Sequence, residues 1–262
     1  MPSRRTYLAS LPALVTAGCT SDPGQSKQTP DRPSVTVEAT AVQYAYRHVW
    51  QVDWNDIRAA DGQFVFVTID ASDADETYLA EQFRLVADGE RYARMTFDRN
   101  APADPEVPGP LYGPGREHGP SRRGWLCFPT PATLESAPRL SLDGEWEWPL
   151  DAPKATDAPP EWEFTVDVPE TVAPDETFDL AVSAENVGDG PGVFRGAVNF
   201  SSPLHRPEGF DIPLDPGASG TATVEATAEA ESKLRYGIRT PVRDTEVMVD
   251  VQGETATGTD TG

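Results

Sequence analysis

The sequence predicts an all-β protein made of two antiparallel β-sandwich domains in tandem, and three observations carry this prediction. Short runs in which apolar and polar residues alternate recur along most of the chain, which is the pattern of half-buried strands. Clusters of Pro, Gly, Asp and Asn separate these runs and are typical of turns. A Pro-dense stretch at 149–161 divides the remaining residues into two parts of ordinary domain size.

The first 18 residues are predicted to be a cleaved signal peptide. Arg4 and Arg5 precede a run of apolar and small residues that is too short to cross a bilayer as a helix. The segment Ser3-Arg4-Arg5-Thr6-Tyr7-Leu8 resembles the twin-arginine export signal, with Tyr7 where that family usually has Phe. The resemblance implies that the chain is exported already folded.

A lipid anchor is predicted at Cys19. The segment Thr16-Ala17-Gly18-Cys19 resembles the lipobox of lipoproteins, and the resemblance implies that Cys19 is acylated and becomes the first mature residue. Residues 19–32 are polar and rich in Pro and Ser, so they cannot bury apolar surface and are predicted to form a disordered tether. We therefore expect a lipid-anchored protein on the extracellular face of the cell membrane.

The charge balance excludes nucleic acid as a partner. The formal net charge is -22, from 43 acidic and 21 basic residues, and a field of this sign repels phosphate backbones. Three lysines against 18 arginines, with abundant Asp, resemble the composition of proteins from halophilic archaea. In molar salt the Debye length is only about 3 Å, so the repulsion among these carboxylates is tolerable there.

Residues 33–149 are predicted to form the first sandwich, with strand-like runs at 35–42, 64–69, 83–86 and 91–95. The segments at 62–67, 83–85 and 124–128 together resemble the telokin-like immunoglobulin-type domain found in lipoproteins. The segment 102–119 is rich in Pro and Gly and too long for a hairpin turn, so we expect an extended surface loop. Such a loop either carries recognition or is an ordered excursion without function.

Residues 150–160 are predicted to be a Pro-rich linker that favours neither helix nor sheet, and residues 161–252 the second sandwich. Its strand-like runs lie at 162–168, 178–185, 193–200, 221–228 and 246–251. The segments 168–178 and 182–189 resemble the adhesion-related, CARDB-like immunoglobulin-like modules of prokaryotic surface proteins, in which an Asn-x-Gly turn joins two strands. The resemblance implies fold and surface location but no ligand. A disordered tail is expected at 253–262.

No catalytic residue and no cofactor or metal site is predicted, which favours a protein that is not an enzyme. With Cys19 acylated, Cys127 has no disulfide partner, and its apolar surroundings favour a buried, inert thiol. His48, His118 and His205 lie in separate segments without the spacing of a metal pair or a catalytic base. Nucleophile elbows, phosphate-binding loops and dinucleotide motifs are absent from the sequence.

Three further features have competing interpretations. The carboxylates at Asp70, Asp73, Asp75 and Glu76 could bind Ca²⁺, but they lack the EF-hand pattern and suit a solvated loop. Asn199-Phe200-Ser201 is an N-glycosylation sequon, whose use on folded cargo requires Asn199 to face solvent. The aromatic residues near the start of the first domain either contact a partner, as expected for Trp50 and Trp54, or pack in the core, as the shared strand face of Tyr44 and Tyr46 favours.

The function that these features favour is a non-catalytic binding or structural module for a surface protein or a glycan. One alternative is a solute-binding or transport-accessory lipoprotein, which would need a concave pocket lined by polar and aromatic groups. A second alternative is a hydrolase without a recognisable motif, in which the plentiful carboxylates supply the acid and base.

Overall fold

The computed structural model describes residues 32–50, 54–97, 101–115, 119–200, 207–228 and 233–252. Almost all regular structure in these residues is antiparallel β-sheet, and the all-β sandwich prediction is confirmed. The predicted signal peptide with Arg4 and Arg5, the acylation site Cys19 and the tail at 253–262 lie outside the described residues. Among the described residues, no helix has the length and hydropathy needed to span a membrane.

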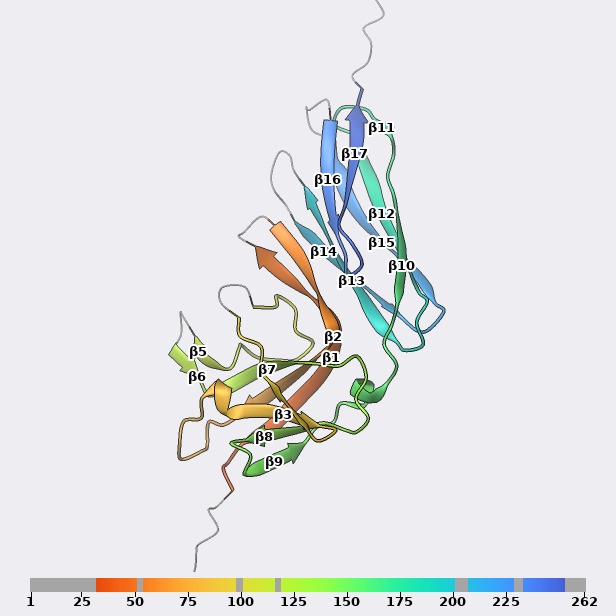
Figure 1. Cartoon of the computed structure of the whole chain (residues 1–262). Coiled ribbons are helices and arrows are strands. Elements are labelled where there is room, and N and C mark those ends of the chain that lie inside the picture. The colour runs from red at the N-terminus through yellow and green to blue at the C-terminus, as the bar shows by residue number, and fades with distance from the viewer. Residues whose placement is uncertain are drawn as a thin grey trace, which may run out of the picture. The chain divides into compact units, whose positions relative to one another are not determined.

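The first sandwich packs a three-stranded sheet against a four-stranded sheet (Figure 1). The first sheet has the order β1-β2-β7, with bounds Thr36–Trp50, Trp54–Asp70 and Arg123–Thr130. The second has the order β4-β3-β8-β9, with bounds Glu90–Ala93, Phe83–Ala87, Arg139–Leu142 and Trp146–Pro149. A 3-10 helix, η1 (Ala80–Gln82), precedes β3, and β5 (Gly113–Gly115) pairs with β6 (Gly119–Ser121).

Strand β2 is buried on both faces between residues 63 and 69. Its odd-numbered residues Val65, Val67 and Ile69 belong to the core between the two sheets. Phe64 and Phe66 face the other way, into a second apolar cluster with Tyr46, Trp125 and Cys127. The predicted surface loop contributes Val107 to that cluster, while Tyr112 is buried in the main core. The loop is therefore packed along the sandwich for much of its length.

The Pro-dense stretch between the sandwiches is packed against both of them. Leu150, Ala152 and Ala155 are buried in the first core, and a short 3-10 helix, η2 (Pro153–Thr156), forms where the sequence predicted no helix. It begins with Pro153, which suits the first turn because proline has no backbone N–H to leave unpaired. Further on, Pro159 approaches the turn at 187–191 so closely that a Cβ on Gly188 would lie 2.8 Å from the Pro159 carbonyl oxygen.

The second sandwich packs a three-stranded sheet against a five-stranded one. The first sheet has the order β10-β12-β15, with bounds Trp162–Asp167, Thr177–Asn186 and Ser219–Thr227. The second has the order β11-β17-β16-β13-β14, with bounds Thr171–Val172, Thr245–Val251, Lys233–Arg239, Gly192–Phe200 and Glu208–Leu214. Strand β11 runs parallel to β17, and the other pairs are antiparallel. This division of strands between two sheets is that of an immunoglobulin-like domain.

Asn186 holds the predicted Asn-x-Gly turn together. Its buried amide Nδ2 donates to the carbonyl oxygens of Gly190 and Leu214, at 2.8 and 3.3 Å. Its Oδ1 accepts from the backbone N–H groups of Gly188 and Glu161, at 3.1 and 3.3 Å. One side chain thus satisfies backbone groups of the turn, of β14 and of the segment that enters the second sandwich.

Candidate functional site: the junction of the two sandwiches

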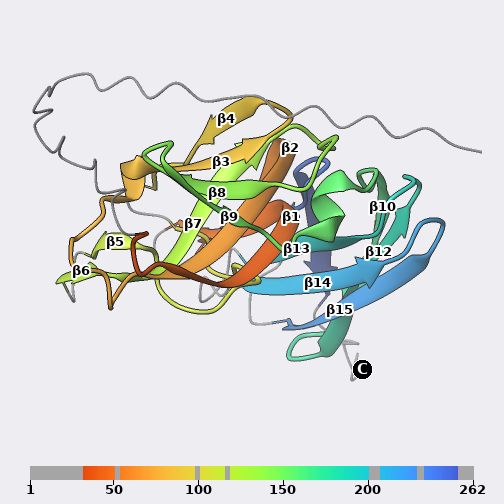
Figure 2. The same ribbon diagram turned by 90° about the horizontal axis from the view of Figure 1, so that it is seen from below.

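The distal half of the β1–β2 hairpin extends from the first sandwich onto the second. The ladder between β1 and β2 is interrupted after Gln43, which pairs with Phe64, whereas Ala45 pairs with Ala59. Beyond this bulge, β1 and β13 lie side by side (Figure 1, Figure 2). Ala45 and Ile57 of the hairpin form a small apolar cluster with Ala197 of β13.

Strand β13 is buried on both faces because the hairpin covers its outer face. Phe194 and Val198 point into the core of the second sandwich. Arg195, Ala197 and Asn199 alternate with them on the outer face, yet they are only 3%, 0% and 0% exposed. An arginine and an asparagine therefore lie in an interface, where each needs polar partners.

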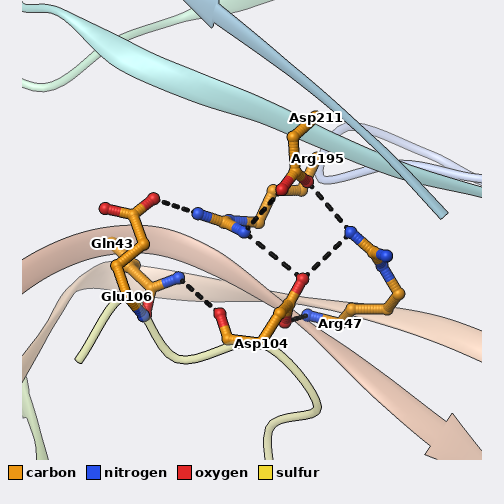
Figure 3. A network of polar contacts seen from close by, with 6 residues as sticks. All are labelled: Gln43, Arg47, Asp104, Glu106, Arg195 and Asp211. Carbon is orange, nitrogen blue, oxygen red and sulfur yellow. Dashed lines mark hydrogen bonds and ion pairs between the residues drawn. The ribbon is translucent and has the colours of Figure 1, made fainter. Parts of the chain in front are cut away.

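Arg195 finds its partners in three carboxylates (Figure 3). One guanidinium nitrogen, Nη1, lies 3.3 Å from Asp104 Oδ2 and 3.1 Å from Asp211 Oδ2. The other, Nη2, is ion-paired with Glu106. Asp211 is the cross-strand neighbour of Arg195 on β14, whereas Asp104 and Glu106 come from the 101–112 segment of the first sandwich. The buried charge is thus compensated from both sandwiches.

Arg47 of β1 closes the network (Figure 3). Its Nη2 lies 2.9 Å from Asp104 and 3.0 Å from Asp211, so it bridges the same two carboxylates as Arg195. Its backbone N–H donates to Asp104 Oδ1 at 3.1 Å. The guanidinium also lies directly over Gly209, where a Cβ would be 1.9 Å from Nη1. Glycine at this position leaves the room that Arg47 occupies.

Gln43 fixes the segment that carries the two acidic residues. Its Nε2 donates to the carbonyl oxygen of Asp104 at 3.4 Å, and its Oε1 accepts from the N–H of Glu106 at 3.3 Å. These bonds position Asp104 and Glu106 toward the arginines. The network contains two guanidinium groups and three carboxylates, which are paired with one another. It therefore binds the two sandwiches together and orients them, and it offers no nucleophile next to a free base.

A second polar contact of the junction joins Asn199 to Asn55. The Asn199 side chain accepts from the Asn55 N–H and donates to the Asn55 carbonyl oxygen, both at 2.8 Å. The condition for glycosylating folded cargo, a solvent-facing Asn199, is therefore not met. The side chain is fully buried and both of its polar ends are used, so Asn199 presents no free amide to a transferase once the chain is folded.

Of the two aromatics expected to contact a partner, the structure describes the side chain of Trp54, which is half-buried and contacts β16 of the second sandwich. The Arg239 guanidinium of β16 lies 4.9 Å from the centroid of the Trp54 ring, and Arg239 also pairs with Asp244 at 3.1 Å. Tyr46 is buried, and Tyr44 packs against the first core. The side chain of Trp50 lies outside the described set.

The other candidate groups are not brought into the junction network. Cys127 is 1% exposed, and burial raises the pKa of its thiol, which keeps it protonated and inert. Asp70 accepts from the Ser72 N–H at 2.8 Å, and hydrogen bonds from Ser72 lower the pKa of its carboxyl group. No described residues form a group of three metal-ligating side chains, and His118 and His205 lie outside those residues.

Sequence reasoning did not single out Gln43, Arg47, Asp104, Glu106, Arg195 or Asp211. One signal was present, because Val193 to Phe200 is a mainly apolar run of the second domain and Arg195 interrupts it. A charged residue inside such a run indicates either a solvent-facing side of the strand or a buried ion pair. The sequence alone does not distinguish these two environments.

The chain was compared with protein families, curated proteins and solved structures, and only solved structures align with it. No protein-family model and no curated protein matches it. A β-glucosidase from Listeria innocua in complex with glucose aligns at 18% identity and a TM-score of 0.31, over 36% of this chain and 16% of that one. The chain thus spans about 16% of the length of that enzyme.

Two smaller structures also align. The CARDB domain of a Pyrococcus furiosus protein in complex with di-metal ions has 15% identity and a TM-score of 0.31, over 35% of this chain and 93% of that one. Domains 4 and 5 of the S-layer protein SbsC have 14% identity and a TM-score of 0.22, over 82% of this chain and 98% of that one. Likenesses at this level carry no conclusion about function, and the telokin-like and CARDB-like resemblances stay predictions.

Proposed function

We propose that this protein is a lipid-anchored, non-catalytic module on the outer face of the cell membrane, which holds two immunoglobulin-like sandwiches in one fixed arrangement for binding a surface protein or a glycan. The observation that carries the proposal is the junction. Arg195, 3% exposed, is ion-paired to Asp104 and Glu106 of the first sandwich and to Asp211 of the second.

A fixed arrangement is not the ordinary state of two linked domains. Domains joined by a linker move relative to one another unless their interface is extensive. Here the linker residues Leu150, Ala152 and Ala155 are buried in the first core, and the β1–β2 hairpin covers β13. A buried arginine adds specificity to this interface, since any displacement of the sandwiches would separate its charge from Asp104 and Glu106 and leave Asp211 as its remaining carboxylate in the network. Such a unit can present one ligand-binding surface at a set orientation to the membrane.

The proposed anchor and export route depend on the sequence. Arg4 and Arg5 would direct export, and acylated Cys19 would hold the chain through the tether at 19–32. Export of folded cargo suits this fold, because the contact between Asn55 and Asn199 joins residues 144 positions apart and forms only when both sandwiches are folded. The acidic composition would keep the displayed surface hydrated in concentrated salt.

The proposal also holds that the chain is not an enzyme. The arginines and carboxylates of the junction bind one another, so none is positioned to activate a substrate or a water molecule. The remaining candidate nucleophile, the Cys127 thiol, is buried and protonated.

Export, anchoring and binding can be tested in one experiment. The full chain with a C-terminal tag is expressed in a salt-adapted archaeal host beside Cys19→Ser and an Arg4→Lys/Arg5→Lys variant. We expect the unmodified chain in the membrane fraction and sensitive to external protease, Cys19→Ser in the medium, and the double variant inside the cell. Cross-linking in molar salt followed by mass spectrometry should then identify a protein or glycoprotein enriched with the anchored chain. A Cys19→Ser variant that stays in the membrane would contradict the anchor.

A further inference from the structure

A hollow of about 350 Å³ opens on the first sandwich at the bulge of β2. It lies where the β1–β2 ladder is interrupted, so that residues 60–63 have no partner on β1. Bulges of this kind redirect side chains and are common beside binding sites. Gly62 in the bulge approaches the end of β7 so closely that a Cβ there would lie 2.3 Å from the carbonyl oxygen of Thr130. This close approach joins the bulge to the β7 end and shapes the hollow.

The walls of the hollow are mainly apolar and aromatic. Phe64 is buried beneath it, and Tyr92 and Met95 are half-buried at its side. Pro129 and Pro131, which are exposed, also line it. These rings and the thioether offer contact area to an aliphatic chain, and Tyr92 adds an aromatic ring.

The electrostatic environment of the hollow is negative. Of the described residues that line it, Asp61 alone carries a charge at neutral pH. Asp88 and Glu90 also act on this region, since after burial they are the causes that raise the pKa of Tyr92. Asp61 itself has no ion-pair partner among the described residues.

Three basic side chains that are close in sequence to the lining residues are engaged elsewhere. Arg58 pairs with Asp56 at 3.0 Å, and Arg94 pairs with Glu81 at 3.5 Å. The Arg91 guanidinium lies against Gly144, where a Cβ would be 2.8 Å from its Nη1. The hollow therefore combines an apolar wall with an uncompensated carboxylate at its rim.

We propose that this hollow binds a lysine or arginine side chain of a partner protein. The aliphatic stem would pack against Met95 and the two prolines, and the cationic end would lie between the Tyr92 ring and the Asp61 carboxylate. Such cations are attracted both by aromatic faces and by carboxylates, and their stems cover apolar surface. The Asp61 carboxylate favours a cation over a neutral sugar, and it acts at contact distance, where screening by salt is weakest.

This inference rests on the proposed function, because it names the partner of a binding module as a protein with a basic contact residue. The anchoring and fractionation results do not depend on the hollow. If the hollow does not bind the cation, the module is still anchored but has its ligand elsewhere. If the anchoring experiment fails, the hollow can still be tested on the purified chain.

The test uses the chain's own methionines as reporters. The sequence has three, Met1, Met95 and Met248, and Met248 is 58% exposed on β17 of the second sandwich. The purified Cys19→Ser chain with ¹³C-methyl methionine is titrated by NMR with n-butylguanidinium, n-butanol and glucose, at the lowest salt concentration that keeps it folded. We expect n-butylguanidinium to shift the Met95 methyl resonance saturably in the millimolar range and to leave Met248 unmoved.

Three variants separate the contributions. Asp61→Asn should weaken the binding of n-butylguanidinium about threefold, and Tyr92→Leu about fivefold. Asp179→Asn makes the same charge change on the exposed face of the second sandwich and should have no effect. The proposal is overturned if n-butanol shifts Met95 as strongly as the cation, if glucose shifts it instead, if Asp61→Asn and Asp179→Asn behave alike, or if no probe shifts it.

Discussion

The Asn199 side chain binds both backbone polar groups of Asn55, although the two residues are 144 positions apart. The amide accepts from the N–H and donates to the C=O at 2.8 Å each, as the backbone of a neighbouring strand would. Asn199 is 0% exposed and Asn55 is 7% exposed, so water does not compete for these groups. One side chain of the second sandwich thereby satisfies the backbone hydrogen bonds of Asn55, near the start of β2 in the first sandwich.

Replacing Asn199 should destabilise the whole chain. Asn199→Ala leaves the buried N–H and C=O of Asn55 without partners, at a cost of about 2–5 kcal/mol in the free energy of unfolding. Urea unfolding followed by tryptophan fluorescence measures this loss. Thr223→Ala on the exposed face of β15 is the control and should change stability by less than about 0.5 kcal/mol. Equal effects of the two variants would show that the contact contributes nothing.

Removing the buried guanidinium should have a similar effect for a different reason. Arg195→Ala leaves Asp104, Glu106 and Asp211 facing one another with Arg47 as their one remaining cation in the network, and we expect a loss of about 3–5 kcal/mol. Arg235→Ala provides the comparison, because Arg235 pairs with Glu246 at the exposed surface, where an ion pair contributes at most about 1 kcal/mol. The interpretation of the junction fails if both variants lose the same small amount in thermal or urea unfolding.

Local sequence pattern was sufficient to predict the class of fold and many strands of the second domain. The alternating runs at 162–168, 178–185, 193–200, 221–228 and 246–251 overlap β10, β12, β13, β15 and β17. Strands β14 and β16 were not predicted. β14 contains Gly209 and Pro213, and β16 contains Gly237, which are residues that ordinarily argue against a strand. Pro213 is tolerated because β14 is an edge strand.

The junction could not be predicted in the same way. Alternation along β13 places Arg195 and Asn199 on the polar side of a half-buried strand, and that side is normally solvated. Their burial depends on the hairpin at 36–70 and on the 101–112 segment, and no local pattern links those residues to β13. The positions of Asp104 and Glu106 were likewise hidden, because a Pro- and Gly-rich segment has no periodicity from which to infer which side chains point inward.

Adding one methyl group at Gly209 should disturb the network without removing a charge. A Cβ there would lie 1.9 Å from Arg47 Nη1, so Gly209→Ala must displace the guanidinium from Asp104 and Asp211. We expect a loss of about 1–3 kcal/mol in urea unfolding. Gly237→Ala is matched to it, since a Cβ at Gly237 meets Trp54 at an ordinary 3.5 Å and should leave stability unchanged or slightly raised. Equal stabilities of the two variants would mean that the Arg47 guanidinium can shift away from residue 209 without losing its ion pairs.

Salt should stabilise the three-stranded sheet of the second sandwich through identifiable pairs. Glu163 lies directly opposite Glu185, and Asp179 opposite Glu225, on its exposed face. Like charges in such positions repel by about 0.2–1 kcal/mol. Salt weakens this repulsion as the Debye length falls from about 10 Å at 0.1 M to about 3 Å at 1 M.

Glu225→Lys turns the second of these pairs into an attractive one. We expect it to raise stability at the lowest salt concentration that keeps the chain folded, and to flatten the dependence of the free energy of unfolding on salt. Glu208→Lys is the control. It makes the same charge change on β14, but the residue directly opposite is Val198, so no like-charge pair is removed. Equal salt dependence for the two variants would argue against a specific role of the cross-strand pairs.

The hairpin between β3 and β4 should make stability depend on acid pH through Asp88. This residue adopts a left-handed conformation with φ 55° before Gly89, a combination typical of two-residue hairpin loops. Its carboxylate accepts from Ser136 Oγ at 2.7 Å and from the Glu135 N–H at 2.9 Å. These hydrogen bonds, that of Ser136 first, hold the pKa of Asp88 below its usual 3.8.

Because the folded-state pKa of Asp88 is lowered, its contribution to stability is present above the unfolded-state pKa and is lost as the pH falls through the folded value. Asp88→Asn tolerates the left-handed conformation but carries no charge. We expect it to be less stable than the unmodified chain near pH 7, with a difference that shrinks toward about pH 3 in urea unfolding at constant salt. Ser136→Ala, which removes the main cause of the pKa shift, should reproduce this dependence. A difference that stays constant with pH would mean that the Asp88 charge is not what these bonds stabilise.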